Sequence, residues 1–90
     1  MSVLVDARGL LCPLPVLRLR KVLLGQAVGA RVRLLATDAM AAVDVPHFCE
    51  GAGHRLLDQR DTGCGVIEFT VERGPSAPPA AGAASPPEDI

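Results

Sequence analysis

Aromatic side chains are scarce in this 90-residue sequence, which has no tryptophan, no tyrosine and only two phenylalanines, Phe48 and Phe69. A hydrophobic fraction of 49% still supports one globular core, built mainly from leucine, valine, isoleucine and alanine. The scarcity of aromatic rings argues against stacking on bases, and a formal net charge of -1 argues against phosphate binding. We therefore expect no direct binding to nucleic acid.

Long apolar stretches and paired cysteines are also missing. No run of about 18 uninterrupted apolar residues occurs, and residues 1–7 do not combine a basic segment with an apolar one. Membrane insertion and secretion are therefore not expected. Three cysteines, Cys12, Cys49 and Cys64, occur without a Cys-x-x-Cys pair, which favours a reducing cytoplasm over a disulfide scaffold.

The pattern of apolar residues predicts the order strand, helix, strand, helix, strand, strand. Val16, Leu19 and Leu23 form the predicted inward stripe of the first helix. Asp44, followed by Val45 and Pro46, is typical of a capped start of the second helix. The predicted strands cover residues 2–6, 31–37, 54–60 and 65–73, and the predicted helices cover residues 13–24 and a segment between residues 38 and 50.

This order of elements predicts an α/β fold, namely a two-layer α/β sandwich with two helices on one face of a mixed four-stranded sheet. The other face of the sheet should be polar. Residues 1–73 form the predicted domain. Residues 74–90 are rich in proline, alanine, serine and glycine with an acidic end, which predicts a disordered tail.

Cys12 follows the first strand and its loop and directly precedes Pro13, which places it at the predicted N-cap of the first helix. Unpaired N–H groups and the positive end of the helix dipole favour a thiolate or a persulfide anion there, by about 0.3–2 kcal/mol. Pro13 and Pro15 stiffen the same turn and fix the direction in which the cysteine projects. The alternative is that Cys12 is a small buried hydrophobic residue.

Residues 6–15, Asp-Ala-Arg-Gly-Leu-Leu-Cys-Pro-Leu-Pro, closely resemble the signature of the TusA/SirA-like family of sulfur carriers. Residues 36–38, 44–49 and 53–54 extend the resemblance, which covers about residues 2–73. It implies a sulfurtransferase whose Cys12 accepts sulfur as a persulfide from an upstream donor, a cysteine desulfurase or rhodanese-like protein. The sulfur then passes to an acceptor protein, in tRNA thiolation, molybdenum cofactor synthesis or sulfur oxidation. Leu14 fills the variable position of the motif and does not select among these pathways.

Several residues near Cys12 are candidates for a supporting role. Gly9, Pro13 and Pro15 shape the loop and the first turn, and Arg8 either stabilises the anion of Cys12 or is a solvated loop arginine. Three basic residues of the first helix and two aspartates are candidate contacts for a partner protein, with a solvated helix face and cap or turn roles as the alternatives. These are Arg18, Arg20, Lys21, Asp38 and Asp44.

The remaining cysteines and the histidines give weaker signals. Cys49 is predicted to pack on the inner side of the second helix near Phe48, with a resolving thiol as the alternative. Cys64 lies in the predicted hairpin turn, where nothing beside it indicates activation. His47 and His54 do not match a zinc spacing, so no metal is expected.

Three functions remain open from the sequence. The first is sulfur transfer through a covalent persulfide on Cys12, without a metal or an organic cofactor. The second is a regulatory or docking module in which Cys12 is only structural. The third is a thiol-redox protein that pairs Cys12 with Cys49 or Cys64. A cytoplasmic monomer is the default expectation for all three.

Overall fold

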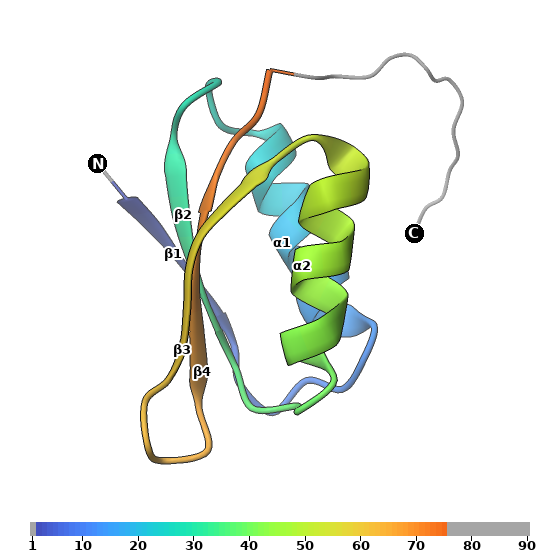
Figure 1. Ribbon diagram of the computed structural model, residues 1–90, viewed down its shortest axis with the longest axis vertical. Helices are drawn as coiled ribbons and strands as arrows, with labels where there is room; N and C mark the ends of the chain where they lie inside the picture. The colour runs from blue at the N-terminus through green and yellow to red at the C-terminus, as the bar shows by residue number, and fades with distance from the viewer. Residues whose placement is uncertain (1, 76–90) are drawn as a thin grey trace.

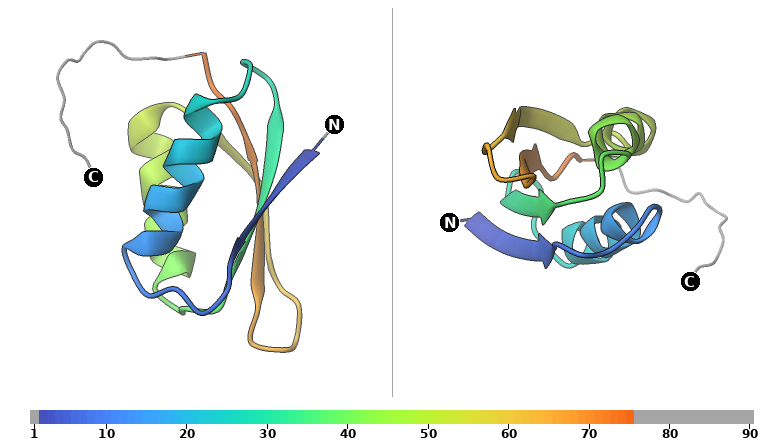
Figure 2. Two further views of the ribbon diagram at one scale, coloured as in Figure 1. Left: turned by 180° about the vertical axis from the view of Figure 1, so that it is seen from behind. Right: turned by 90° about the horizontal axis from the view of Figure 1, so that it is seen from below.

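The computed structural model describes residues 2–75, which form two helices packed on one face of a four-stranded sheet (Figure 1). The two-layer arrangement is clearest from below, where both helices lie on the same side of the strands (Figure 2). The predicted fold class and order of elements are confirmed. The elements are β1 (Ser2–Ala7), α1 (Leu14–Leu24), β2 (Arg31–Ala36), α2 (Ala41–Ala52), β3 (Arg55–Asp61) and β4 (Ile67–Glu72).

The sheet has the strand order β1-β2-β4-β3. Strands β1 and β2 are parallel, and β4 pairs antiparallel with both β2 and β3. Two adjacent parallel strands need a crossover connection, which α1 supplies here. Because the carboxyl ends of β1 and β2 lie side by side, the loops that follow them meet at one edge of the molecule.

Alternate residues of the strands form the core with one stripe from each helix. Leu19 and Leu23 of α1 are fully buried, as predicted, but Val16 is only half-buried, and Pro15 takes its place in the core. Pro15 lies one turn before Leu19, so it continues the same stripe toward the start of the helix. The strands and α2 contribute Val5, Ala7, Val32, Leu34, Ala36, Phe69, Val71, Ala41, Val45 and Cys49.

Helix α2 begins at Ala41, so the prediction of a capped start at Asp44 is wrong. The side chain of Asp38 accepts the N–H of Met40 at 3.1 Å, and this contact starts the helix earlier. Asp44 lies in the first turn instead. Pro46 is inside the helix, where its missing N–H leaves the carbonyl of Ala42 without its usual donor. The side chain of Gln59 on β3 donates to that carbonyl at 3.4 Å.

The last two strands both begin later in the chain than predicted. β3 begins at Arg55 rather than at His54, because Gly53 ends α2 with a positive φ of 82° and the N–H of His54 bonds to the carbonyl of Cys49. β4 begins at Ile67, because a loop closed by the N–H of Thr62 and the carbonyl of Val66 precedes it. Local turn geometry therefore delays the start of both strands.

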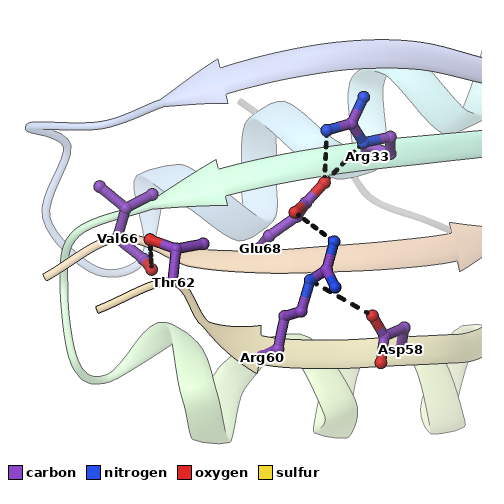
Figure 3. Close-up of polar contacts among 6 residues, drawn as sticks. All are labelled: Arg33, Asp58, Arg60, Thr62, Val66 and Glu68. Atoms are coloured by element: carbon purple, nitrogen blue, oxygen red, sulfur yellow. Dashed lines mark hydrogen bonds and ion pairs between the residues drawn. The ribbon is translucent and has the colours of Figure 1, made fainter. Parts of the chain in front are cut away.

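The sheet face opposite the helices is polar, as predicted, and carries a row of charges across three strands (Figure 3). Arg33 donates to Glu68 at 2.6 Å, and Arg60 contacts the other oxygen of Glu68 at 3.4 Å and Asp58 at 3.8 Å. The Arg33 hydrogen bond, with help from Arg60, lowers the pKa of the Glu68 carboxyl. The two arginines therefore offset the charges of the two carboxylates that they contact.

Within residues 2–75, no helix is both long and apolar enough to cross a membrane. Residues 74 and 75 follow the last strand, and Gly74 is buried. The rest of the predicted tail, residues 76–90, lies outside the part of the chain that the structure describes.

Candidate functional site

The candidate site lies where the loops after β1 and β2 meet. The N–H of Gly9 donates to Oγ1 of Thr37 at 2.8 Å, and the N–H of Cys12 donates to Oδ2 of Asp38 at 2.6 Å. Gly9 has a φ of +83°, a conformation that residues with a side chain rarely adopt. Glycine therefore allows the chain to turn toward Cys12 at this position. These two bonds hold the loop that carries Cys12 against the loop that leads into α2.

Cys12 is exposed, but it is not the cap residue of α1. The helix starts at Leu14, and Pro13 is its cap, because the carbonyl of Pro13 accepts the N–H of Leu17 at 3.1 Å. The peptide bond between Cys12 and Pro13 is cis. The predicted N-cap position of Cys12 is therefore wrong by one residue, and its own N–H bonds to Asp38.

The thiol of Cys12 bonds to a carboxylate from α2. Its Sγ donates to Oδ2 of Asp44 at 2.6 Å. This hydrogen bond raises the pKa of the Cys12 thiol, and partial removal from water and the negative charges of Asp44 and Asp38 raise it further. The start of α1 was predicted to favour a thiolate at Cys12, but the pKa of the empty thiol moves in the opposite direction, because the Asp44 hydrogen bond, removal from water and the nearby carboxylates all favour the protonated form.

Arg8 does not contact Cys12 in the structure. Its guanidinium binds the carboxylate of Asp6 through Nε and Nη2, both at 2.9 Å. This pairing lowers the pKa of Asp6 to about 2. Arg8 therefore supports the shape of the loop after β1, and the carboxylates of Asp38 and Asp44 are the charged groups that act on the thiol.

Sequence reasoning missed the contact of Asp44 with Cys12. The residues are separated by 32 positions, and the aspartate before Val45 and Pro46 resembled a helix cap. The usable signal was the position of both residues after parallel neighbouring strands, since the loops at the carboxyl ends of such strands converge.

A surface groove of about 790 Å³ runs along α1, next to the loop that carries Cys12. Its walls combine apolar and basic side chains, which come from the loop and from the exposed side of the helix. It includes all three basic residues that were predicted as partner contacts. The lining residues are Leu10, Leu14, Leu17, Arg18, Arg20, Lys21, Val22 and Leu24.

The other two cysteines lie in different surroundings. Cys49 is 2% exposed and packs in the core near Phe48, as predicted, and burial raises the pKa of its thiol to about 11. Cys64 is exposed in the loop between β3 and β4. His54 contacts the ring of Phe48 at 5.6 Å between centroids and accepts the N–H of Gly74 through Nδ1 at 2.9 Å.

The fold and the site together define a class of small α/β sandwiches that hold one exposed thiol just before a helix, in a Cys-Pro-Leu-Pro sequence. A family model described as Sulfurtransferase TusA matches residues 3–73. The chain therefore belongs to the TusA family of sulfur carriers, and the resemblance seen in the sequence is confirmed.

Individual relatives agree with this assignment. The sulfur carrier protein TusA of Pseudomonas putida is 40% identical over 58 residues, which cover 64% of this chain and 72% of the relative. A putative sulfur carrier protein of Neisseria meningitidis is 42% identical over 67 residues, covering 74% and 89%. The crystal structure of a SirA-like protein from Desulfitobacterium hafniense has a TM-score of 0.73 and 31% identity, covering 82% of this chain and 99% of that one.

Proposed function

We propose that Cys12 accepts sulfane sulfur as a persulfide from a donor protein and passes it to an acceptor protein. The observation that carries this proposal is the exposure of Cys12 outside the core, where loops after two parallel strands hold its backbone. Membership in a family of sulfur carriers supports a donor and an acceptor in general. A sulfurtransferase that works as a carrier needs this access, because its cargo must reach two different proteins in turn.

The surroundings of Cys12 are suited to a visiting protein. Leu11 and Leu14, on either side of Cys12 in the sequence, are 70% and 48% exposed. Met40 and Val43, at the start of α2 near Asp44, are 50% and 62% exposed. Exposed apolar residues on both sides of a reactive thiol favour a protein contact there, because a partner would remove them from water.

The proposal is tested by intact-mass analysis of the protein after incubation with a cysteine desulfurase and cysteine. We expect a gain of one sulfur atom, reversed by a reducing thiol and absent in Cys12→Ala. Cys64→Ser is the matched control and should gain the sulfur normally, because Cys64 is exposed but lies in the β3–β4 loop. A sulfur adduct that persists in Cys12→Ala would contradict the proposal, as would a wild-type protein that gains no sulfur from desulfurase or rhodanese-like donors.

The groove along α1 is the proposed docking surface for the donor. Arg18, Arg20 and Lys21 are all exposed there and make it basic, so the matching surface of the donor should be acidic with apolar side chains. Asp38 and Asp44 were also predicted as partner contacts. However, Oδ2 of each aspartate already accepts a hydrogen bond from Cys12. We therefore assign docking to the α1 groove.

Arg18→Glu is expected to slow sulfur transfer from a purified donor about tenfold at low salt, because charge reversal opposes electrostatic steering. The difference should shrink as salt is added, since exposed charges are screened. Arg55→Glu is the control with the same charge change, and it lies on β3, where its side chain is 76% exposed. Equal slowing by both variants would mean that net charge, and not the groove, governs the encounter. The measurement is the initial rate of sulfur transfer at several salt concentrations.

A further inference from the structure

The bond between Cys12 and Asp44 depends on a proton on Sγ, which a persulfide at Cys12 does not carry there. In the structure, Sγ of Cys12 is the donor and Oδ2 of Asp44 is the acceptor, 2.6 Å apart. Asp44 is half-buried in the first turn of α2, a position where the helix dipole favours a negative charge. The N–H of Cys12 is held separately by Asp38. The cysteine is therefore tied twice to the segment that opens α2, once through its backbone and once through its thiol.

Sulfur transfer removes this proton. Sγ of Cys12 forms a bond to the outer sulfur of the donor persulfide, and the bond from that sulfur to the donor cysteine breaks. The electron pair stays on the donor cysteine, which takes up the proton that Cys12 loses. The outer sulfur moves with its oxidation state unchanged, so no oxidant or reductant is needed. The products are a Cys12 persulfide and a free donor thiol.

The loaded Sγ is bonded to carbon and to sulfur, so it cannot donate to Asp44. The lone pairs of Sγ and of Oδ2 of Asp44 would then face each other at 2.6 Å. Their repulsion must move the two atoms apart. As long as Cβ and Sγ keep their positions, the outer sulfur lies one S–S bond beyond Sγ and does not occupy the place of the donor atom. An anionic persulfide is also repelled by the carboxylates of Asp38 and Asp44. The site therefore favours the empty thiol over the loaded persulfide.

We propose that Asp44 is a positioning residue that distinguishes the empty from the loaded state of Cys12 and favours release of the sulfur to the acceptor. This inference rests on the proposed function of Cys12. Without the hydrogen bond to Asp44, the empty state loses a contact that the loaded state never had. The loaded state should then hold its sulfur more strongly.

The test is the sulfur-exchange equilibrium with glutathione persulfide and glutathione, read by intact mass in a Cys64→Ser background. Asp44→Asn should raise the equilibrium constant for loading about tenfold, because it removes the negative charge that strengthens the hydrogen bond of the empty thiol and that repels an anionic persulfide. Glu50→Gln is the matched control, because it removes one exposed carboxylate from the same helix, and it should leave the constant unchanged. Asp44→Ser serves as a second variant if the asparagine protein is not folded by circular dichroism.

A second readout separates this role from a general effect on structure. The pH profile of Cys12 alkylation should move to lower pH in Asp44→Asn, because Asp44 and Asp38 are the charged groups that raise the pKa of the thiol. Equal equilibrium constants and equal alkylation profiles in wild type and Asp44→Asn would overturn the inference. Failure of all proteins, wild type included, to take up sulfur would instead overturn the proposed function.

Discussion

Phe69→Ala is expected to lower the free energy of unfolding by about 3–5 kcal/mol. Phe69 is the largest fully buried side chain of the core and lies on β4 opposite Leu34 of β2. Alanine would remove most of the ring and leave a cavity that the surrounding strands can only partly close. Since small domains are stable by about 5–15 kcal/mol, this one change would remove a large part of the total.

The measurement for Phe69→Ala is urea unfolding followed by circular dichroism, compared with the wild type. Leu4→Ala is the control, because Leu4 is also a large apolar residue of the sheet but is 55% exposed. Its effect should stay within about 0.5 kcal/mol, as for other surface substitutions. A loss below about 1 kcal/mol for Phe69→Ala would show that the core does not depend on this ring.

Gly74→Ala should also destabilise the fold, by about 1–3 kcal/mol, through crowding and not through a cavity. A Cβ at this position would lie 1.7 Å from the carbonyl oxygen of Gly53, and because the neighbouring atoms are backbone, the chain itself must shift to make room. The N–H of Gly74 donates to Nδ1 of His54 at 2.9 Å, and its carbonyl accepts Nη1 of Arg73 at 2.8 Å. Burial and the charge of Arg73 lower the pKa of His54, which favours the neutral ring that accepts this bond.

Thermal unfolding and amide exchange at residue 74 measure the effect of Gly74→Ala. Gly51→Ala is the control with the same chemical change, because a Cβ at Gly51 would meet no atom within 4 Å. Gly51 lies inside α2, where alanine is the better helix former, so this variant should gain about 0.5–1 kcal/mol. Effects of the same sign in both variants would contradict the predicted crowding at Gly74.

Local patterns predicted the fold well wherever one face of an element is buried. The alternation of Ile67, Phe69 and Val71 with polar residues identified β4 and its inner face, because side chains alternate across a strand. The same logic failed at the ends of elements. Asp44 and Pro46 looked like a helix start, yet the contact of Asp38 with Met40 begins α2 earlier, and Gln59 from another strand compensates for the proline.

At the candidate site, too, some features were predicted correctly and others were not. Cys12 was identified from the sequence, because a cysteine before Pro-x-Pro at a predicted helix start is unusual and resembles a known motif. The direction in which the site shifts the pKa of this thiol was predicted wrongly. The helix dipole could be inferred from residues near Cys12 in the sequence. The carboxylates that raise the pKa of the thiol belong to Asp38 and Asp44, which follow β2 in the chain and are distant from Cys12 in the sequence.

The order of helices and strands, the two-layer class of fold, the family and the identity of the exposed cysteine could all be read from the amino-acid sequence. Each of these depends on residues close together in the chain, through side-chain periodicity, turn chemistry or a contiguous motif. The hydrogen bond between the thiol and the carboxylate of Asp44, and the groove of basic and apolar side chains beside it, became visible only in the folded chain. Those facts depend on how β1 and β2 pair and where α2 begins, because strand pairing brings residues 32 positions apart within hydrogen-bond distance.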